Sequence, residues 1–357
     1  MNKLVKTVSC TGMAVILAAA GLSGCGNTLD GTKTAATVGE EKITAGTVNM
    51  MLRFTQAQMD SYYAMFGGSI SGLWSQEGED GKTYAESTKD DVKEQIHDMV
   101  LLEQHAPDYD VSVSEEEQKK ITEAAKQFME DNDPETITKL AVTQADIEKI
   151  LELYTYQSKM FDPMTADVDT NVEDKEAQQS KITYCRISTA ATTDEDGNSQ
   201  ELTEEEKAAK KEQAQKLIDQ LNAQEDPAAA DMDALAKEID ENLGAYTNTF
   251  GANEENEESS LDENLVAAAK ELKDGQVASQ VIEGEDAYFV VRMDSTFDEE
   301  STQSKKDEIV SERKQEAYND LLEQWGEETE IKVVNSVWKK MELTDMDNCA
   351  FKQSEEQ

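Results

Sequence analysis

The sequence is poor in the residues that build metal centres, disulfide frameworks and nucleic-acid interfaces. Its 357 residues include only 2 histidines and 4 cysteines, so neither a multi-histidine metal site nor a disulfide-dense scaffold is expected. Basic residues number 33 against 77 acidic ones, which gives a formal net charge of −44. Because affinity for phosphate backbones and anionic lipid surfaces depends on clustered lysine and arginine, this balance argues against nucleic-acid binding and against a polybasic membrane contact.

The motifs of several enzyme classes are missing as well. The chain has no P-loop, no dinucleotide-binding glycine fingerprint and no serine–histidine–aspartate set. The acidic stretch 194–198 is followed by Ser199, where a calcium-binding EF-hand loop needs glycine, and the closing glutamate is also missing. We therefore predict that the protein uses no cofactor and no metal.

What the sequence does contain is a periodic pattern of apolar residues. The hydrophobic fraction is 38% and the charged fraction 31%, which is polar for a globular protein. The apolar positions nevertheless recur at helix and strand spacing, so the chain is expected to fold. At roughly 150 residues per domain, the length suggests about two domains.

The first 24 residues are typical of a bacterial lipoprotein signal peptide. Lys3 and Lys6 precede the mostly apolar stretch 13–22, and residues 22–25 (Leu-Ser-Gly-Cys) resemble a lipobox. The apolar run is too short to span a core of about 30 Å comfortably, although an uncleaved signal anchor is the alternative. We expect a mature chain that begins at an acylated Cys25 and is lipid-anchored to the cell membrane on its extracytoplasmic face, at a Gram-positive surface or in a periplasm.

Cleavage and acylation would leave two other cysteines. Cys10 is lost with the signal peptide and Cys25 carries the lipid, so Cys185 and Cys349 remain. The two could pair in an oxidising compartment, but their wide separation does not establish a disulfide. We favour two free or buried thiols.

Helical patterns dominate both ends of the chain. A short extended segment with a turn is expected over residues 36–44, and Ser114 to Glu117 form a capping box that opens a helix. The other helices of this part are predicted over residues 47–66, 86–105 and 143–161, with Ile96, Met99 and Val100 in the apolar stripe of the second. A long helix is predicted over residues 301–328, followed by a segment rich in β-branched residues over 331–338.

A block of about 120 residues interrupts this helical pattern. Strands are predicted at 181–189, 277–282 and 287–293, and helices at 203–223, 227–240 and 261–272. The apolar stripe of the helix over 301–328 cannot be buried by that helix alone. We therefore predict an α+β fold in which this helix packs on the N-terminal helices and the mixed block is an insert.

The order of these elements resembles the PrsA/SurA-type extracytoplasmic foldases. Residues 181–187 are similar to the first strand of a parvulin-type (PpiC-like) peptidyl-prolyl isomerase, 243–246 to its Leu-Gly-aromatic turn, and 287–291 to its final strand. The resemblance implies a mainly helical chaperone domain around an inserted parvulin-like domain with a central antiparallel sheet. The implied boundaries are 1–24 signal peptide, 25–34 tether, 35–178 N-terminal helical chaperone domain, 179–297 parvulin-like domain, 298–345 C-terminal helix and strand completing the chaperone domain, and 346–357 tail.

The sequence departs from parvulins at the positions that carry their chemistry. Cys185 and Phe289 stand where the family has two facing histidines, and Leu261 and Leu265 stand where Met and Phe line the proline pocket. Rotation of an X–Pro bond needs an apolar socket and groups that stabilise the twisted amide. Leu261, Leu265 and Phe289 could still form that socket, but the imidazoles are gone. The resemblance thus implies a catalytically impaired isomerase, with an active parvulin as the alternative.

Residues outside that block suggest how clients are bound. His97 and His105 are eight residues apart on one helix, about 12 Å along its axis, and lie in the other domain, so they cannot replace the missing pair. The Met- and aromatic-rich stretch 50–74 is interpreted mainly as core. Within it, the residues left as candidates for contact with clients are Tyr62, Tyr63, Phe66 and Trp74.

The resemblance implies unfolded or partly folded secreted polypeptides as partners, and homodimers are compatible with it. A second hypothesis is a solute-binding or structural surface lipoprotein. Solute-binding proteins contain repeated βαβ units, whereas strands are few here and helices dominate, so we favour the first hypothesis.

Overall fold

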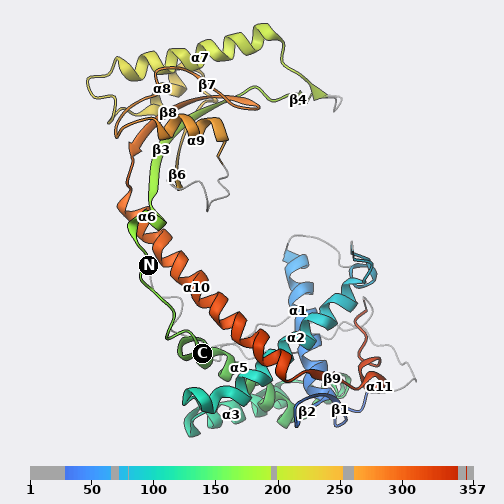
Figure 1. The fold of residues 1–357 in the computed structure, drawn as a ribbon. Coiled ribbons are helices and arrows are strands. Elements are labelled where there is room, and N and C mark those ends of the chain that lie inside the picture. The colour runs from blue at the N-terminus through green and yellow to red at the C-terminus, as the bar shows by residue number, and fades with distance from the viewer. Residues whose placement is uncertain are drawn as a thin grey trace. The chain divides into compact units, whose positions relative to one another are not determined.

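The computed structural model describes residues 29–65, 72–78, 80–193, 199–251, 261–344 and 351 (Figure 1). The chain divides into two compact units: the helical unit, which comprises residues up to Val168 and from Gln315 onward, and the sheet unit, Asp169–Lys314. The combination of helices with small antiparallel sheets confirms the predicted α+β class. Among the residues described, no helix is long and apolar enough to span a membrane.

The helical unit is assembled from both ends of the chain. Its C-terminal part consists of the end of α10 (Glu299–Glu328), β9 (Ile331–Val333) and α11 (Asn335–Trp338). The elements of its N-terminal part are β1 (Thr34–Val38), β2 (Glu41–Thr44), α1 (Ala45–Met65), η1 (Leu73–Ser75), α2 (Tyr84–His105), η2 (Ala106–Tyr109), α3 (Glu115–Asp131), α4 (Pro134–Leu140) and α5 (Gln144–Met164).

A three-stranded antiparallel sheet joins the two chain ends. Its strand order is β2-β1-β9, and β1 is central because Ala36 pairs with Val333 of β9 and with Ile43 of β2. The segment 331–338, which is rich in β-branched residues, is extended only in its first half. The amides of Val337 and Trp338 both donate to Val334 O, which turns residues 335–338 into a helical turn.

Capping boxes begin four of the helices. Ser114 accepts from the amide of Glu117, whose carboxylate accepts from Ser114 in return, as predicted for the start of α3. Thr83 and Glu86 open α2, and Thr143 and Asp146 open α5, in the same way. Each box satisfies two amides that the first turn of a helix otherwise leaves without partners.

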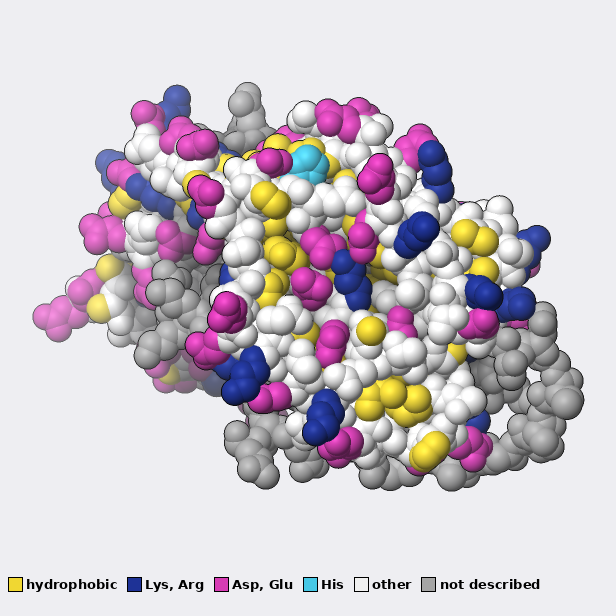
Figure 2. Space-filling view, turned by 90° about the horizontal axis from the view of Figure 1, so that it is seen from below, with side chains coloured by type: hydrophobic (Ala, Val, Ile, Leu, Met, Phe, Trp, Pro, Cys, Tyr) yellow, Lys and Arg dark blue, Asp and Glu magenta, His cyan; other side chains and the backbone are white. Residues whose placement is uncertain are grey.

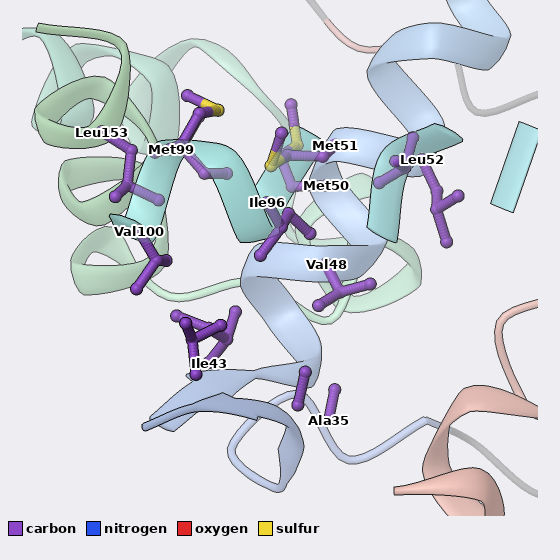
Figure 3. Close-up of a cluster of buried hydrophobic side chains, with 14 of the residues drawn as sticks. Ala35, Ile43, Val48, Met50, Met51, Leu52, Ile96, Met99, Val100 and Leu153 are labelled. Carbon is purple, nitrogen blue, oxygen red and sulfur yellow. The ribbon is translucent and has the colours of Figure 1, made fainter. Parts of the chain in front are cut away.

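The core of the helical unit lies among α1, α2, α5 and the strands (Figure 3). Ile96, Met99 and Val100 of α2 face Leu153 of α5, following the predicted helical stripe. Tyr318, Leu322 and Trp325 of α10 belong to the same core, so the end of the long helix does pack on the N-terminal helices.

The sheet unit has a four-stranded antiparallel sheet of order β6-β3-β8-β7. The predicted strand at 277–282 is largely absent: Val277 forms an isolated bridge with Arg292, and only β7 is a regular strand. The elements are α6 (Asp174–Ala177), β3 (Gln179–Ser188), β4 (Thr192–Thr193), β5 (Ser199–Gln200), α7 (Glu204–Asn222), α8 (Met232–Ile239), β6 (Ala245–Gly251), α9 (Glu263–Lys270), β7 (Ile282–Glu283), β8 (Ala287–Ser295) and the start of α10.

Two hydrophobic clusters divide this sheet into two faces. One cluster joins the sheet to α7 and α8, and includes Leu217 of α7 and Val290 of β8. The other joins it to α9, and includes Leu265 of α9 and Val291 of β8. Neighbouring residues of β8 therefore belong to opposite faces, as the pleat of a strand requires.

Acidic side chains are spread over the surface among basic ones. Figure 2 shows Asp and Glu interspersed with Lys and Arg across the visible face, without one segregated acidic patch. Many lysines form exposed ion pairs with a glutamate one helical turn away, such as Lys120 with Glu116 and Lys139 with Glu135. Such pairs contribute little to stability, so we interpret these charges as a solvated surface.

Candidate functional site

The candidate site of the sheet unit is the sheet face under α9. Phe289 of β8, Leu265 of α9 and the partly buried Leu261 belong to its hydrophobic cluster. The structure thus brings together three of the four residues that sequence comparison with parvulins singled out.

Cys185 does not join them, and its predicted position opposite Phe289 is wrong. It belongs to the cluster under α7 and α8, on the other face of the sheet, where it is a fully buried free thiol. Burial raises its pKa to about 11. Because side chains alternate along a strand, an alignment error of one residue moves a side chain to the opposite face.

Tyr184 of β3 lies on the same face of the sheet as Phe289. Its ring centroid lies 6.2 Å from that of Phe289 and 5.8 Å from that of Tyr246 on β6. Tyr246 is directly opposite Tyr184 in the strand register and is 58% exposed. Burial raises the pKa of Tyr184, so the hydroxyl stays neutral near pH 7. The site therefore presents an aromatic pair in place of imidazoles.

Sequence reasoning missed Tyr184 and counted Tyr246 only as part of a turn. The signal was present in the alternation of β3, where Ile182 and Tyr184 share one face and Cys185 and Ile187 the other. Choosing between the two faces needed the position of α9, which the pattern of the strand does not contain.

Phe289 and Leu265 are packed core residues in this structure. Both are buried, and the turn between β7 and β8 lies directly over them. A Cβ atom on Gly284 would come within 2.5 Å of Phe289 Cε2. Asn264 Nδ2 donates to Glu283 O at 2.9 Å, and the amide of Glu285 donates to Asp262 Oδ2 at 3.3 Å, which holds the turn against the start of α9. Of the apolar residues predicted as a proline socket, Leu265 and Phe289 are thus buried in the core of the sheet unit, and Leu261 is partly buried.

A short connection joins α8 to β6. Helix α8 ends at Ile239, the amide of Leu243 donates to Asp240 O, and β6 begins at Ala245. Asp233 Oδ1 accepts from the amide of Ala245 at 3.1 Å, which fixes the entry into the strand. The acidic residues 254–258 lie outside the described part of the chain.

The candidates for client contact in the helical unit differ in exposure. Tyr62 is 56% exposed and Tyr63 is half-buried, with their rings 6.0 Å apart near the end of α1. Met65, the last residue of α1, is also exposed. Trp74 is only 2% exposed and packs against Tyr84 at 5.4 Å, so it belongs to the core and not to an exposed contact surface. Phe66 lies outside the described residues.

Both histidines lie on α2 of the helical unit and contact the C-terminal arm, by which we mean residues 315–344. His97 Nε2 lies 2.6 Å from Thr329 O. His105 stacks on Trp325 with ring centroids 4.0 Å apart, and its Nδ1 lies 3.0 Å from Asp108. These contacts give both side chains a structural role, consistent with the prediction that they do not complete the site of the sheet unit.

Two further predictions concern the lipid anchor and metal binding. Cys25 and the rest of the signal-like segment lie outside the described residues, and so does Cys349. Within the described part of the chain, no three His, Cys, Asp or Glu residues are arranged to hold a metal ion.

Comparison with known proteins identifies the N-terminal part of the chain. Residues 1–137 match the family model of the SurA-like N-terminal domain. No curated protein matches the sequence.

Several solved structures of foldases are similar to parts of the chain. The peptidylprolyl isomerase PrsA of Bacillus cereus has 16% identity and a TM-score of 0.28, with 74% of this chain and 95% of that chain covered. Foldase PrsA of Streptococcus pneumoniae has 15% identity and a TM-score of 0.23 over 74% and 97% of the two chains. A SurA-like chaperone structure from Campylobacter jejuni has 16% identity and a TM-score of 0.25 over 71% and 95%. These TM-scores lie below 0.5, so they do not by themselves establish a shared function.

Proposed function

We propose that this chain, whose residues 1–137 match the SurA-like N-terminal domain, is a membrane-anchored extracytoplasmic chaperone, or foldase, that assists the folding of secreted proteins. The family match of residues 1–137 is the observation that carries the proposal. Unfolded or partly folded polypeptides are the corresponding substrates.

The end of α1 supplies a surface suited to such substrates. Tyr62 and Met65 are exposed on the same terminal turn of the helix. A flexible Met side chain and an amphipathic Tyr ring adapt to many apolar partners without demanding one sequence. Weak and broad binding of this kind is what a chaperone of many clients requires.

We further propose that the sheet unit has little or no isomerase activity. The sequence has no histidine in this unit, since its two histidines are at positions 97 and 105. The barrier to X–Pro rotation is about 20 kcal/mol, and lowering it needs contacts that stabilise the twisted amide more than the planar one. With Leu265 and Phe289 packed beneath the β7–β8 turn, the sheet unit supports a role as scaffold or peptide-contact surface.

The anchor is proposed from the sequence alone. The lipobox-like residues 22–25 favour diacylglyceryl modification of Cys25, and two acyl signals are enough for stable membrane attachment. Cys25→Ser should release the protein from the membrane fraction, and mass spectrometry of the wild-type N-terminal peptide should detect the lipid. A wild-type N-terminal peptide that carries no lipid would refute lipid anchoring.

The proposed function is tested by two assays on one protein sample. Aggregation of a chemically unfolded client is followed by light scattering, and refolding of a client limited by proline isomerisation is followed by fluorescence. We expect suppressed aggregation and an unchanged slow refolding phase. No suppression at a several-fold molar excess refutes the chaperone, and acceleration of the slow phase shows an active parvulin instead.

A matched pair of variants separates the two units in these assays. Tyr62→Ser and Tyr246→Ser remove the same side chain from sites of nearly equal exposure, 56% and 58%. Tyr62→Ser should weaken aggregation suppression several-fold, whereas Tyr246→Ser should have little effect. The opposite order would assign client binding to the sheet unit.

A further inference from the structure

The segment that follows α11 lies on the helical unit like an extended peptide. Residues 341–344 are neither helix nor strand, and their side chains alternate between buried and exposed. Met341 and Leu343 are 1% and 5% exposed, respectively, and belong to the core of the unit, whereas Glu342 between them is exposed. The segment is thus bound through apolar side chains two positions apart.

Three side chains of α1 and α2, which we call the donor strip, donate to main-chain carbonyls at the end of α11 and along this segment. Arg53 Nη2 donates to Glu342 O at 2.9 Å, and Gln56 Nε2 donates to Thr344 O at 3.2 Å. Lys89 Nζ donates to Trp338 O at 3.1 Å. Main-chain carbonyls are present in every polypeptide, so contacts of this type do not depend on the sequence that is bound.

Polar and charged side chains such as those of the donor strip are unfavourable in a surface that serves only to pack against the core. Arg53 and Gln56 are buried, and burying a guanidinium is unfavourable unless its donors find acceptors. Arg53 Nη1 donates to Gln56 Oε1 at 2.8 Å, which orients both groups toward the segment. Burial lowers the pKa of Lys89. Apolar residues would pack Met341 and Leu343 without this burial of polar groups.

We infer that residues 338–344 occupy a surface that binds clients, and that the donor strip is a binding surface for an extended polypeptide with apolar side chains at positions i and i+2. This inference rests on the proposed chaperone function. Displacement of the segment would expose apolar core surface beside three side chains that donate to main-chain carbonyls. Two of these side chains are cationic, in a chain whose net charge is −44. The proposed external occupant is a segment of an unfolded protein. It would bind as residues 341–344 of this chain do, through two apolar side chains and main-chain carbonyls.

The internal segment sets the affinity for an external one. A tethered segment acts at an effective concentration on the order of 1 mM. If the same sequence binds with an intrinsic dissociation constant of roughly 10–100 µM, the closed form is favoured about 10- to 100-fold, and external binding is weakened by the same factor. Opening the segment should therefore tighten external binding about 10- to 100-fold.

The test uses the full chain and a fluorescent peptide with the sequence of residues 338–344, Trp-Lys-Lys-Met-Glu-Leu-Thr. Fluorescence anisotropy should show at least about tenfold tighter binding to Met341→Ser/Leu343→Ser than to the wild type. A peptide with serine at both apolar positions should bind neither protein. Val334→Ser, which removes an exposed apolar side chain from the same arm, is the control and should match the wild type.

Adding Arg53→Met to the opened variant should lower its affinity for the peptide again by about tenfold, because a hydrogen bond from a charged donor is lost. Equal peptide affinity of the wild type and a folded Met341→Ser/Leu343→Ser variant, judged by circular dichroism, would overturn the inference.

Hydrogen exchange on the wild-type chain provides an independent test that needs no substitution. Saturating peptide should accelerate exchange within residues 338–344 and leave the remainder of the helical unit unchanged. Unchanged exchange in that segment would also overturn the inference. If the wild type and the opened variant suppress aggregation equally, the inference fails while the chaperone function stands; if neither suppresses aggregation, the proposed function fails.

Discussion

The position of Cys185 yields a quantitative prediction about its chemical reactivity. The thiolate is the reactive form, and a pKa raised from 9.0 to about 11 lowers its fraction at pH 7 about 100-fold. The thiol is also fully buried under α7 and α8, so a reagent reaches it only when the unit opens. We expect labelling at least about 100-fold slower than in the unfolded chain.

The assay is alkylation by iodoacetamide at pH 7, followed by digestion and mass spectrometry, so that each cysteine is scored separately. The same protein in urea supplies the reference rate. A folded-state rate at Cys185 within about tenfold of the unfolded rate would refute the assignment of this residue to the covered face.

A pair of variants checks the strand register directly. Tyr184→Cys/Cys185→Ala moves the thiol by one residue, to the half-exposed face that holds Phe289. That thiol should be alkylated at least about tenfold faster than the native one, because neighbouring residues of a strand face opposite sides. Equal rates would mean that the two positions do not differ in burial.

Two further predictions concern the stability of the helical unit. Lys159 and the capping contact with Ser114 hold the pKa of Glu117 at about 2, so its stabilisation is present above the ordinary pKa of 4.5 and is lost as the pH falls toward 2. Glu117→Gln should lower the free energy of unfolding by about 1 kcal/mol at pH 7, since the pair is one-third exposed and screened, and by much less near pH 2, where Glu117 is partly protonated in the folded state. A loss independent of pH in urea melts would contradict the ion pair, and Glu116→Gln is the exposed control. A Cβ atom on Gly46 would lie 2.7 Å from Asp146 Oδ2, so Gly46→Ala should destabilise the protein by about 2 kcal/mol. Gly326→Ala, inside α10 with ordinary contacts to His97, should stabilise the protein by up to about 1 kcal/mol. If Gly46→Ala unfolded at a higher urea concentration than Gly326→Ala, the packing around Asp146 would be contradicted.

Helix starts were the features best predicted from the sequence. The Ser114 box and the stripe of Ile96, Met99 and Val100 depend on local hydrogen bonds and on a fixed helical period. Both remain the same wherever the helix packs, which is why sequence alone can identify them.

Features that depend on tertiary contacts were predicted less well. The stretch 245–251 (Ala-Tyr-Thr-Asn-Thr-Phe-Gly) has the composition of a loop, yet it forms β6 because β3 offers it a pairing partner. Trp74 looked free to contact clients because the sequence does not show that Tyr84 covers it. The face assigned to Cys185 failed for a similar reason, since alternation defines two faces without saying which helix covers each.

The pairing of β1 with β9 also determines when the helical unit can be completed. Ala36 and Val333 are 333 − 36 = 297 positions apart, and contacts at such separations form slowly because a long loop must close first. A chain that emerges from a translocation channel amino end first exposes β1 long before β9. The sheet unit, contained within Asp169–Lys314, can fold while the helical unit still waits for its last strand. During that interval the apolar faces of α1, α2 and α5 remain incompletely covered, so under the proposed export this protein presents, while it folds, the kind of surface that it is proposed to bind in others.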